Sequence, residues 1–382
     1  MRNSGTVTFD GAPPPGTINL GVGQPSADLL PVDLVGKASA AFHADAHPFE
    51  LNYGVLQGDA RFLASLAGFL TDQYGAAVDP DTLFVSGGNS QALDLVSLTF
   101  AQPGDTVFVE EPSYYLAFQI FRDHGLKILS IPMDEDGIVV AELERALEQH
   151  KPAFLYTIPS YQNPAGHCLS LARRKNIVEL AKEHDFLIVA DEVYQLLYYD
   201  ETPPPAFGTM VDSGAVLSLG SFSKILAPAM RLGWIQTSPA LRKQLLENGF
   251  VVSGGSINHI SSHIVRHAID LGLLDRHVVH LRKIYGRRVE TMDQALRKEF
   301  ASLAKWRKPG GGYFFWLEFA EGTNTTPLRQ QAAQLETGFQ AGATFSGNGG
   351  LSNFLRLSFA HYAEDQIEEG IRRMRPLFGR PR

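Results

Sequence analysis

The chain has little cysteine, no long apolar run and no surplus of positive charge. One cysteine, Cys168, among 382 residues excludes a disulfide framework and a cysteine-rich metal site, and fits a reducing compartment. No apolar run reaches the length of a membrane-spanning helix, so none is expected. The 33 lysines and arginines are fewer than the 41 acidic residues and are not clustered. That balance argues against nucleic acid or a membrane as a partner.

Metal-ligand spacing and targeting signals are also lacking. The 12 histidines show no pattern such as H-E-x-x-H, so no metal site is predicted. Residues 1–5 lead into polar, proline-rich sequence rather than into the apolar core of a signal peptide. No internal repeat or low-complexity tract is present. We therefore expect a soluble, cytoplasmic, globular protein.

The apolar content, 44%, is ample for a sizeable core, and the length exceeds that of a usual single domain. Short apolar runs alternate with amphipathic stretches in the first two thirds of the chain, which predicts a mostly parallel α/β sheet. These runs are 83–85, 106–109, 153–158, 187–190 and 215–219.

The pattern changes after about residue 258. A helical region over 259–300 precedes strand-like segments and further helices, which suggests a smaller α+β domain. We predict an N-terminal arm (1–45) packing with the small domain, a large domain (46–258) and the small domain (259–382). Within the small domain we expect strands over 313–319 and 354–359 and helices over 326–341 and 364–374.

Polar residues follow several of the apolar runs. Ligands bind outside the carboxyl ends of strands in open parallel sheets, so these residues are expected to converge on one edge. They are Ser86 to Ser90, Tyr114, Asn163, Asp191 with Tyr194, and Ser221 to Lys224.

The sequence Gly87-Gly88-Asn89-Ser90 lies between a run and a helical stretch. Glycines allow close backbone approach, and a helix start favours an anion, so this is a candidate phosphate cradle. A plain strand-to-helix turn is an equal alternative. The segment matches neither G-x-G-x-x-G nor G-x-x-x-x-G-K-[ST], so readings with NAD or ATP lose support.

The loop 221–231 places Ser221, Ser223, Lys224 and Arg231 together. The serines and the arginine suit a phosphate. A lysine amine in a dry pocket beside Arg231 would be a nucleophile towards carbonyls, although a solvated surface lysine is the commoner case. Asp191 ends the apolar run 187–190, where a carboxylate needs a cationic or hydrogen-bonding partner. It either caps the next helix or pairs with a protonated ring nitrogen.

Taken together, these segments resemble the class I/II aminotransferases among the fold-type-I pyridoxal phosphate (PLP) enzymes. The resemblance covers nearly the whole chain and is greatest to the branch with 2-aminoadipate and kynurenine aminotransferases. It implies a large domain with a mostly parallel seven-stranded sheet. The segments that carry it are Asn163-Pro164-Ala165-Gly166, Asp191-Glu192-Val193-Tyr194, Ser221-Phe222-Ser223-Lys224, Arg231 and Arg356-Leu357-Ser358-Phe359.

The resemblance also implies roles for residues of this chain. Lys224 would form a Schiff base with PLP and move the proton at the substrate α-carbon. Asp191 would pair with the ring nitrogen, and Asn163 and Tyr194 would bond the phenolic oxygen. Tyr114 would stack on the ring, with Tyr115 as a competitor. The phosphate would be held by Asn89, Ser90, Ser221, Ser223 and Arg231.

Further implied roles concern the substrate and a second subunit. Arg356 would clamp the substrate α-carboxylate, with the backbone near Gly23 and the side chain of Asn163 assisting. Tyr53 would reach the phosphate of a neighbouring subunit, which implies a homodimer with shared sites. Tyr53 and Tyr114 as core aromatics, and Arg356 as a surface arginine, are the alternatives.

The function predicted is transfer of the amino group of an L-amino acid to a 2-oxo acid through pyridoxamine phosphate. The same site would also suit a PLP-dependent lyase or a carbon–carbon bond-forming enzyme. A non-enzymatic PLP-binding regulator domain is a third reading. No spacing identifies the amino acid or the acceptor.

Overall fold

The computed structural model describes residue 14 and residues 16–379. The first residues of the predicted arm, with the region assessed for a signal peptide, lie outside this part of the chain. The described residues contain no helix long and apolar enough to cross a membrane. They also contain no group of three or more histidine, cysteine, aspartate or glutamate side chains that could hold a metal ion.

The central feature is a sheet of eight strands in the order β2-β9-β8-β7-β6-β3-β4-β5. Six strands run in one direction, since β3, β4, β6, β7 and β8 pair in parallel and β9 runs antiparallel to both β2 and β8. The seven expected strands are therefore present, and β5 adds an antiparallel edge of two residues. The strands are β2 (Leu83–Ser86), β3 (Thr106–Glu111), β4 (Lys127–Asp134), β5 (Gly137–Ile138), β6 (Pro152–Thr157), β7 (Leu187–Asp191), β8 (Val216–Ser221) and β9 (Gly233–Thr237).

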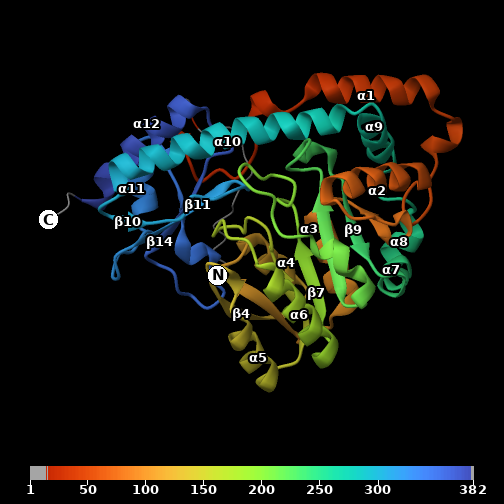
Figure 1. Ribbon diagram of the computed structural model, residues 1–382, viewed down its shortest axis with the longest axis horizontal. Coiled ribbons are helices and arrows are strands. Elements are labelled where there is room, and N and C mark those ends of the chain that lie inside the picture. Colours follow the sequence, from red (N-terminus) through yellow and green to blue (C-terminus); the bar gives the residue numbers. More distant parts are fainter. Residues whose placement is uncertain (1–13, 15, 380–382) are drawn as a thin grey trace.

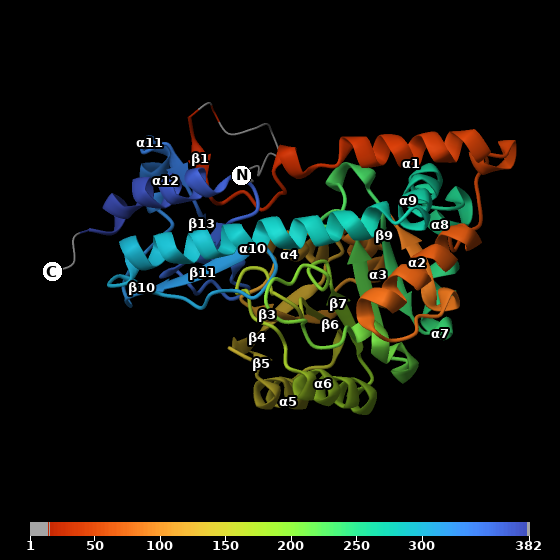
Figure 2. The same cartoon turned by 45° about the horizontal axis from the view of Figure 1, so that its top comes forward.

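Both faces of this sheet are covered, because successive side chains of a strand point to opposite faces. Val189 and Leu217 belong to one apolar cluster, while their neighbours Ile188 and Val216 belong to another that includes side chains of α5 and α6. Figure 2 shows α5 and α6 below the strands and α10 above them. The helices around the sheet are α2 (Ala60–Tyr74), α3 (Asn89–Phe100), α4 (Tyr115–Asp123), α5 (Val140–Gln149), α6 (Leu171–His184), α7 (Pro239–Leu246) and α8 (Gly249–Gly254).

A second, antiparallel sheet lies beside the first and has the order β10-β11-β14-β13. Its strands β11 and β14 match the two predicted for the small domain. The N-terminal segment joins this part of the molecule, since β1 pairs in parallel with β12. The elements are β1 (Ile18–Asn19), β10 (Ala304–Lys305), β11 (Phe314–Phe319), β12 (Thr337–Gly338), β13 (Gln340–Ala341), β14 (Phe354–Ser358), α11 (Leu328–Gln334) and α12 (Glu364–Met374).

The helix predicted over 326–341 is wrong at its C-terminal end. Helix α11 stops at Gln334, Glu336 has φ 51°, and β12 and β13 follow. A side chain at positive φ interrupts a helix, and pairing with β1 takes the backbone hydrogen bonds that a longer helix would use.

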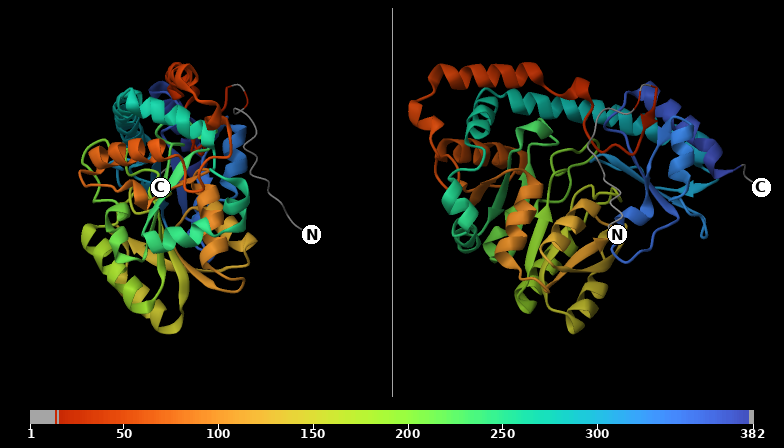
Figure 3. Two further views of the ribbon diagram at one scale, coloured as in Figure 1. Left: turned by 90° about the vertical axis from the view of Figure 1, so that its right-hand side faces the viewer. Right: turned by 180° about the vertical axis from the view of Figure 1, so that it is seen from behind.

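The helical region 259–300 is divided in two. Helix α9 (His259–Asp270) ends before Gly272, whose φ of 61° turns the chain into α10 (Leu273–Phe300). Figure 1 shows α10 running over both sheets, with α1 (Val32–Asp45) above it and α9 at its end. The right-hand view of Figure 3, seen from behind, shows the same arrangement, with the small sheet beside the large one beneath α10.

Candidate active site

The phosphate cradle predicted from Gly87 to Ser90 is the turn between β2 and α3. Gly88 has φ 84°, which favours glycine, and a Cβ there would lie 3.2 Å from Arg231 Nη2. Arg231 donates to Gly87 O at 3.0 Å. The first N–H groups of α3 have no partners within the helix and open beside this guanidinium. The turn and Arg231 thus form one anion-binding corner.

Ser221 and Ser223 belong to the same loop as Arg231. The Ser221 hydroxyl is 3.0 Å from the Ser223 hydroxyl and accepts from Ser223 N at 3.1 Å. Ser90 lies exposed in the first turn of α3. The Asn89 side chain does not point to the corner, because its amide donates to Asp191 Oδ1 at 2.6 Å.

Lys224 is half-buried, and its amine donates to the backbone oxygen of Gly23 at 3.1 Å. Burial, reinforced by the charge of Arg356, lowers the pKa of Lys224 from 10.5 to about 8, against the opposing pull of Asp191. A large fraction of this amine is therefore neutral near pH 8, the form that attacks a carbonyl.

Asp191, at the end of β7, is buried and is held by neutral groups. It accepts from Asn89 at 2.6 Å and from the hydroxyl of Tyr156 at 2.9 Å. Burial raises the pKa of Asp191, although these two hydrogen bonds and the charge of Lys224 act in the opposite direction. Such a carboxylate would gain from a cationic partner, as a protonated ring nitrogen provides.

Arg356, on β14 of the small sheet, is also buried. Its Nη1 donates to Asn163 Oδ1 at 2.8 Å and its Nη2 donates to Gly21 O at 2.9 Å. A Cβ on Gly23 would lie 3.5 Å from Nη2, so Gly23 lies beside both this guanidinium and the Lys224 amine. The Nε atom is buried and has no hydrogen-bond partner among the residues that the structure describes.

The predicted tyrosines fall into two groups. Tyr194 is buried, with its ring edge-on to Phe314 at 6.0 Å, and Tyr114 is half-buried ahead of α4. Burial raises the pKa of both hydroxyls, which keeps them protonated. Tyr53, by contrast, is 75% exposed and is not part of the chain's own site.

Three aromatic residues of the site are absent from the sequence prediction. Tyr156 bonds Asp191, while the rings of Phe314 and Phe345 lie 4.0 and 4.9 Å from the guanidinium carbon of Arg356. Tyr156 is indistinguishable in sequence from the other apolar residues of its strand. The position of Phe314 two residues after Gly310-Gly311-Gly312 was an available signal for its ring, and Phe345 had none.

Known proteins are similar to this chain in sequence and fold along almost its whole length. The family described as aminotransferase class I and II matches residues 15–374. The chain belongs to this family. Aromatic-amino-acid aminotransferase 1 of Thermococcus litoralis is 32% identical to it over 366 residues, which cover 94% of this chain and 87% of that protein.

Two crystal structures are similar to the chain over 95% of its length. LysN, the α-aminoadipate aminotransferase of Thermus thermophilus, complexed with N-(5'-phosphopyridoxyl)-L-leucine, is 30% identical with a TM-score of 0.86 over 92% of its chain. Kynurenine aminotransferase of Pyrococcus horikoshii is 31% identical with a TM-score of 0.88 over 91% of its chain. The predicted family, fold and branch are confirmed.

The protein is thus a PLP-dependent aminotransferase with the PLP fold type I. The comparisons support this function and not the alternative of a lyase or a carbon–carbon bond-forming enzyme. The residues present fit the cofactor. The corner at Gly88 and Arg231 suits a phosphate, the buried Asp191 has no cation in direct contact within the described part of the chain, and Lys224 has an amine that burial holds partly neutral.

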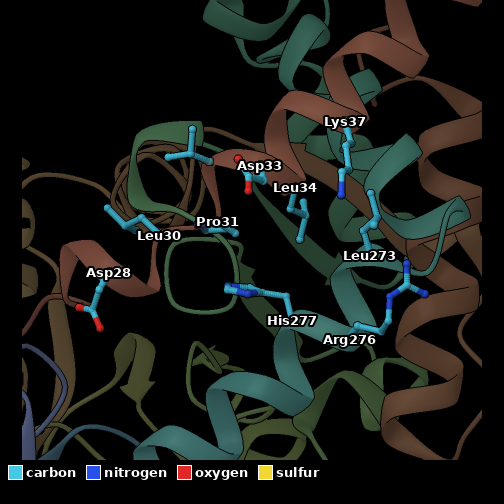
Figure 4. A pocket seen from close by; sticks show the side chains of 10 residues that line it. Asp28, Leu30, Pro31, Asp33, Leu34, Lys37, Leu273, Arg276 and His277 are labelled. Carbon is cyan, nitrogen blue, oxygen red and sulfur yellow. The ribbon is translucent and has the colours of Figure 1, made fainter.

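A hollow of about 520 Å³ lies between the start of α1, with the segment before it, and the start of α10 (Figure 4). Acidic Asp28 and Asp33 and basic Lys37 and Arg276 all line it, so it favours no single ligand charge. None of the predicted site residues is among those that line it, so this hollow is separate from the candidate active site.

Proposed function

We propose that this aminotransferase moves the amino group of an L-amino acid to a 2-oxo acid, with Lys224 as the residue that holds the cofactor and moves the proton. The observation that carries this is that the Lys224 amine and the Arg356 guanidinium both lie beside Gly23. An α-amino acid has an amine and a carboxylate two bonds apart on one carbon. A nucleophilic amine beside a carboxylate-binding cation matches that pair of groups.

When bound, PLP supplies an aldehyde that takes up the amino group and a protonated ring that withdraws electrons from the substrate α-carbon. Lys224 would hold this aldehyde covalently through its side-chain amine. Once the substrate has released it, the same amine would act as the general base that moves the proton at the substrate α-carbon. General-base help of this kind is typically worth about 10²–10⁴-fold in rate.

The other residues hold and orient. Asp191 would pair with the ring nitrogen and keep it protonated, while Asn89 and Tyr156 keep that carboxylate in place. Asn163 and Tyr194 would bond the phenolic oxygen of the ring, and Tyr114 would stack on the ring. The start of α3, with Ser90, Ser221, Ser223 and Arg231, would hold the phosphate.

Arg356 binds the α-carboxylate of the amino acid and of the 2-oxo acid, since both substrates have that group. Its buried Nε without a partner supports this role, because a carboxylate oxygen would satisfy it. Asn163 and Gly21 occupy only two N–H groups of the guanidinium.

We also propose a cytoplasmic homodimer whose two sites are shared. Apolar side chains stand exposed on two adjoining segments, and a contiguous apolar surface marks an interaction site. The segments adjoin because Tyr53 O accepts from Ser256 N at 2.8 Å. The exposed side chains are Phe49, Leu51, Tyr53, Val55, Phe250 and Val252. Tyr53 lies among them, where it would reach the phosphate of the second subunit. Light scattering should give a mass near twice the 41.9 kDa of one chain.

The division into an arm (1–45), a large domain (46–258) and a small domain (259–382) stays part of this proposal. The two separate sheets and the pairing of β1 with β12 support it.

A panel of amino acids, each given with one 2-oxo acid, tests the function. Mass spectrometry should find the 2-oxo acid of at least one donor together with an equal amount of the amino acid formed from the acceptor. Consumption of the donor with release of ammonia or carbon dioxide, and with no new amino acid, would contradict the proposal.

A further inference from the structure

A carboxylate outside the established machinery joins the two sheets close to Arg356. Glu111 ends β3, and its two oxygens accept from the Ser346 hydroxyl and from Gly347 N, the latter at 2.8 Å. Two residues further along, Ser113 N donates to Phe345 O at 2.9 Å. Three consecutive residues, 345–347, are therefore held by the end of β3 and the residues after it.

The turn 345–347 has no room to move towards the large sheet. A Cβ on Gly347 would lie 2.3 Å from the Ser130 hydroxyl on β4 and 3.6 Å from Glu111 Oε2. Glu111 forms no ion pair within 4 Å among the residues that the structure describes. Both oxygens of the Glu111 carboxylate thus accept hydrogen bonds from the turn 345–347.

The turn carries an aromatic side chain to the substrate carboxylate site. Phe345 is fully buried, and its ring centre lies 4.9 Å from the guanidinium carbon of Arg356. Tyr115 and Trp316 pack edge-on against the same ring at 5.4 and 5.6 Å. The ring of Phe345 is therefore held between those of Tyr115 and Trp316, and its position depends on the next two residues of the turn.

The orientation of Arg356 depends in turn on such contacts. Two N–H groups are bonded to Asn163 and Gly21, and the rings of Phe314 and Phe345 contact the guanidinium. A planar guanidinium binds a carboxylate with two parallel hydrogen bonds only when its plane is fixed. Loss of one ring contact would let that plane tilt.

We propose that Glu111 is a positioning residue for the substrate carboxylate: it holds the turn 345–347, which holds Phe345 against Arg356. This inference rests on the proposed role of Arg356. The carboxylate is bound alike before and during the reaction, so Glu111 sets affinity rather than the rate of the chemical step. The amino acid and the 2-oxo acid are affected equally, because both present the same carboxylate.

The test uses the PLP-loaded enzyme and six variants. They are Glu111→Ala, Glu111→Gln, Ser346→Ala, the double variant of Glu111→Ala with Ser346→Ala, Arg356→Lys, and the control Glu144→Ala, which removes an exposed carboxylate on α5. For each, kcat and KM are measured with the donor that the amino-acid panel identifies. Calorimetry then measures the Kd of an unreactive analogue of this donor. The analogue is the carboxylic acid in which hydrogen replaces the α-amino group, so it binds but cannot react.

Glu111→Ala should raise both KM and this Kd about tenfold, or about 1.4 kcal/mol, with kcat changed less than about twofold. Glu111→Gln keeps one oxygen acceptor and Ser346→Ala removes one donor, so both should show smaller rises. Adding Ser346→Ala to Glu111→Ala should have little further effect, because the bond is already lost. Glu144→Ala should match the parent enzyme.

Unchanged KM and Kd in folded Glu111→Ala would overturn the inference, and so would a fall in kcat as large as the rise in KM. If Glu111→Ala does not fold, Glu111→Gln and Ser346→Ala decide by the same two readouts. Arg356→Lys separates the two proposals. If that change leaves Kd for the acid as it was, the proposed function fails, whatever Glu111 does.

Discussion

Two neighbours in sequence, Asp191 and Glu192, belong to buried polar regions of opposite kinds. Glu192 lies 3.7 Å from Arg174 and also accepts from Phe207 N at 2.8 Å and from the Ser218 hydroxyl at 2.5 Å. Arg174 in turn donates to four further oxygens. This pair, which we call the scaffold pair, has both charges and nearly all donors satisfied.

The region of Asp191 and Lys224 is open by comparison. Each of these two groups is bonded to neutral partners, Asn89 and Tyr156 for Asp191 and the oxygen of Gly23 for Lys224. Burial shifts the pKa of each towards its neutral form. Burial of a charged side chain therefore does not by itself distinguish a catalytic residue from a structural one. The difference is that each charge of the scaffold pair has an oppositely charged partner within the chain, whereas Asp191 and Lys224 would find theirs in the cofactor.

Removal of the Lys224 amine should give the largest effect, and on rate alone. Lys224→Ala should lower kcat by about 10⁴-fold or more, because the same amine holds the cofactor and moves the proton. The free energy of unfolding should not fall, since burial already disfavours the charged amine. Steady-state kinetics and thermal unfolding of the same preparation measure both. Loss of stability on the scale of the loss of rate would remove the distinction between the two regions.

The scaffold pair should respond in the opposite way. Arg174→Met leaves Glu192 buried without its cation, so the free energy of unfolding should fall by about 3–5 kcal/mol. The kcat of the molecules that remain folded should be unchanged. Denaturant titration and active-site counting measure the two quantities. Adding Glu192→Gln should recover part of the stability, and a further loss would be contrary to this account.

Asp191→Asn should lower kcat by about 10²–10³-fold, because the ring nitrogen loses the charge that keeps it protonated. The cost in stability should be below about 1 kcal/mol, because the new amide oxygen can accept from Asn89 and the new NH2 group can donate to the hydroxyl oxygen of Tyr156. Glu192→Gln, one residue away, is the matched control. Glu192→Gln should lower the free energy of unfolding and leave kcat unchanged. If both variants changed kcat and the free energy of unfolding to the same extent, the comparison would be contradicted.

The smallest effect concerns pH. In the protein freed of cofactor, Lys224 has a pKa of about 8 instead of 10.5, so the unfolded chain binds more protons between these values. Stability should therefore rise with pH from about 8 to 10.5, by at most about 3 kcal/mol, relative to a Lys224→Met variant. Denaturant unfolding of the two proteins at each pH gives this difference. A difference that is flat over the window would show that the amine is not held neutral by burial.

Much of the large sheet was predictable because each strand and the helix after it form a local unit. The apolar runs 187–190 and 215–219 are strands whose ends carry Asp191 and lead to Lys224, as predicted. Elements of two residues were not predictable, since β12 exists only by pairing with β1, more than 300 residues away. The same distance explains why the helix prediction over 326–341 was too long.

Site residues were found where a polar group interrupts an apolar pattern and were missed where an ordinary residue acquires a role through a distant contact. Tyr156 bonds Asp191 across 35 residues, and Glu111 bonds Ser346 across 235. Asn89 lies at the predicted turn, yet its side chain serves Asp191, because the ends of β2 and β7 meet at one edge of the sheet. No local pattern contains that information.

Reduction with borohydride tests the central claim most directly. The PLP-loaded protein is treated with borohydride, digested and analysed by mass spectrometry. The account predicts one stable phosphopyridoxyl group on the side chain of residue 224, and none after prior conversion of the enzyme by an amino donor. A phosphopyridoxyl group on any other lysine would contradict it, and so would the absence of this group from enzyme that was reduced without prior contact with an amino donor.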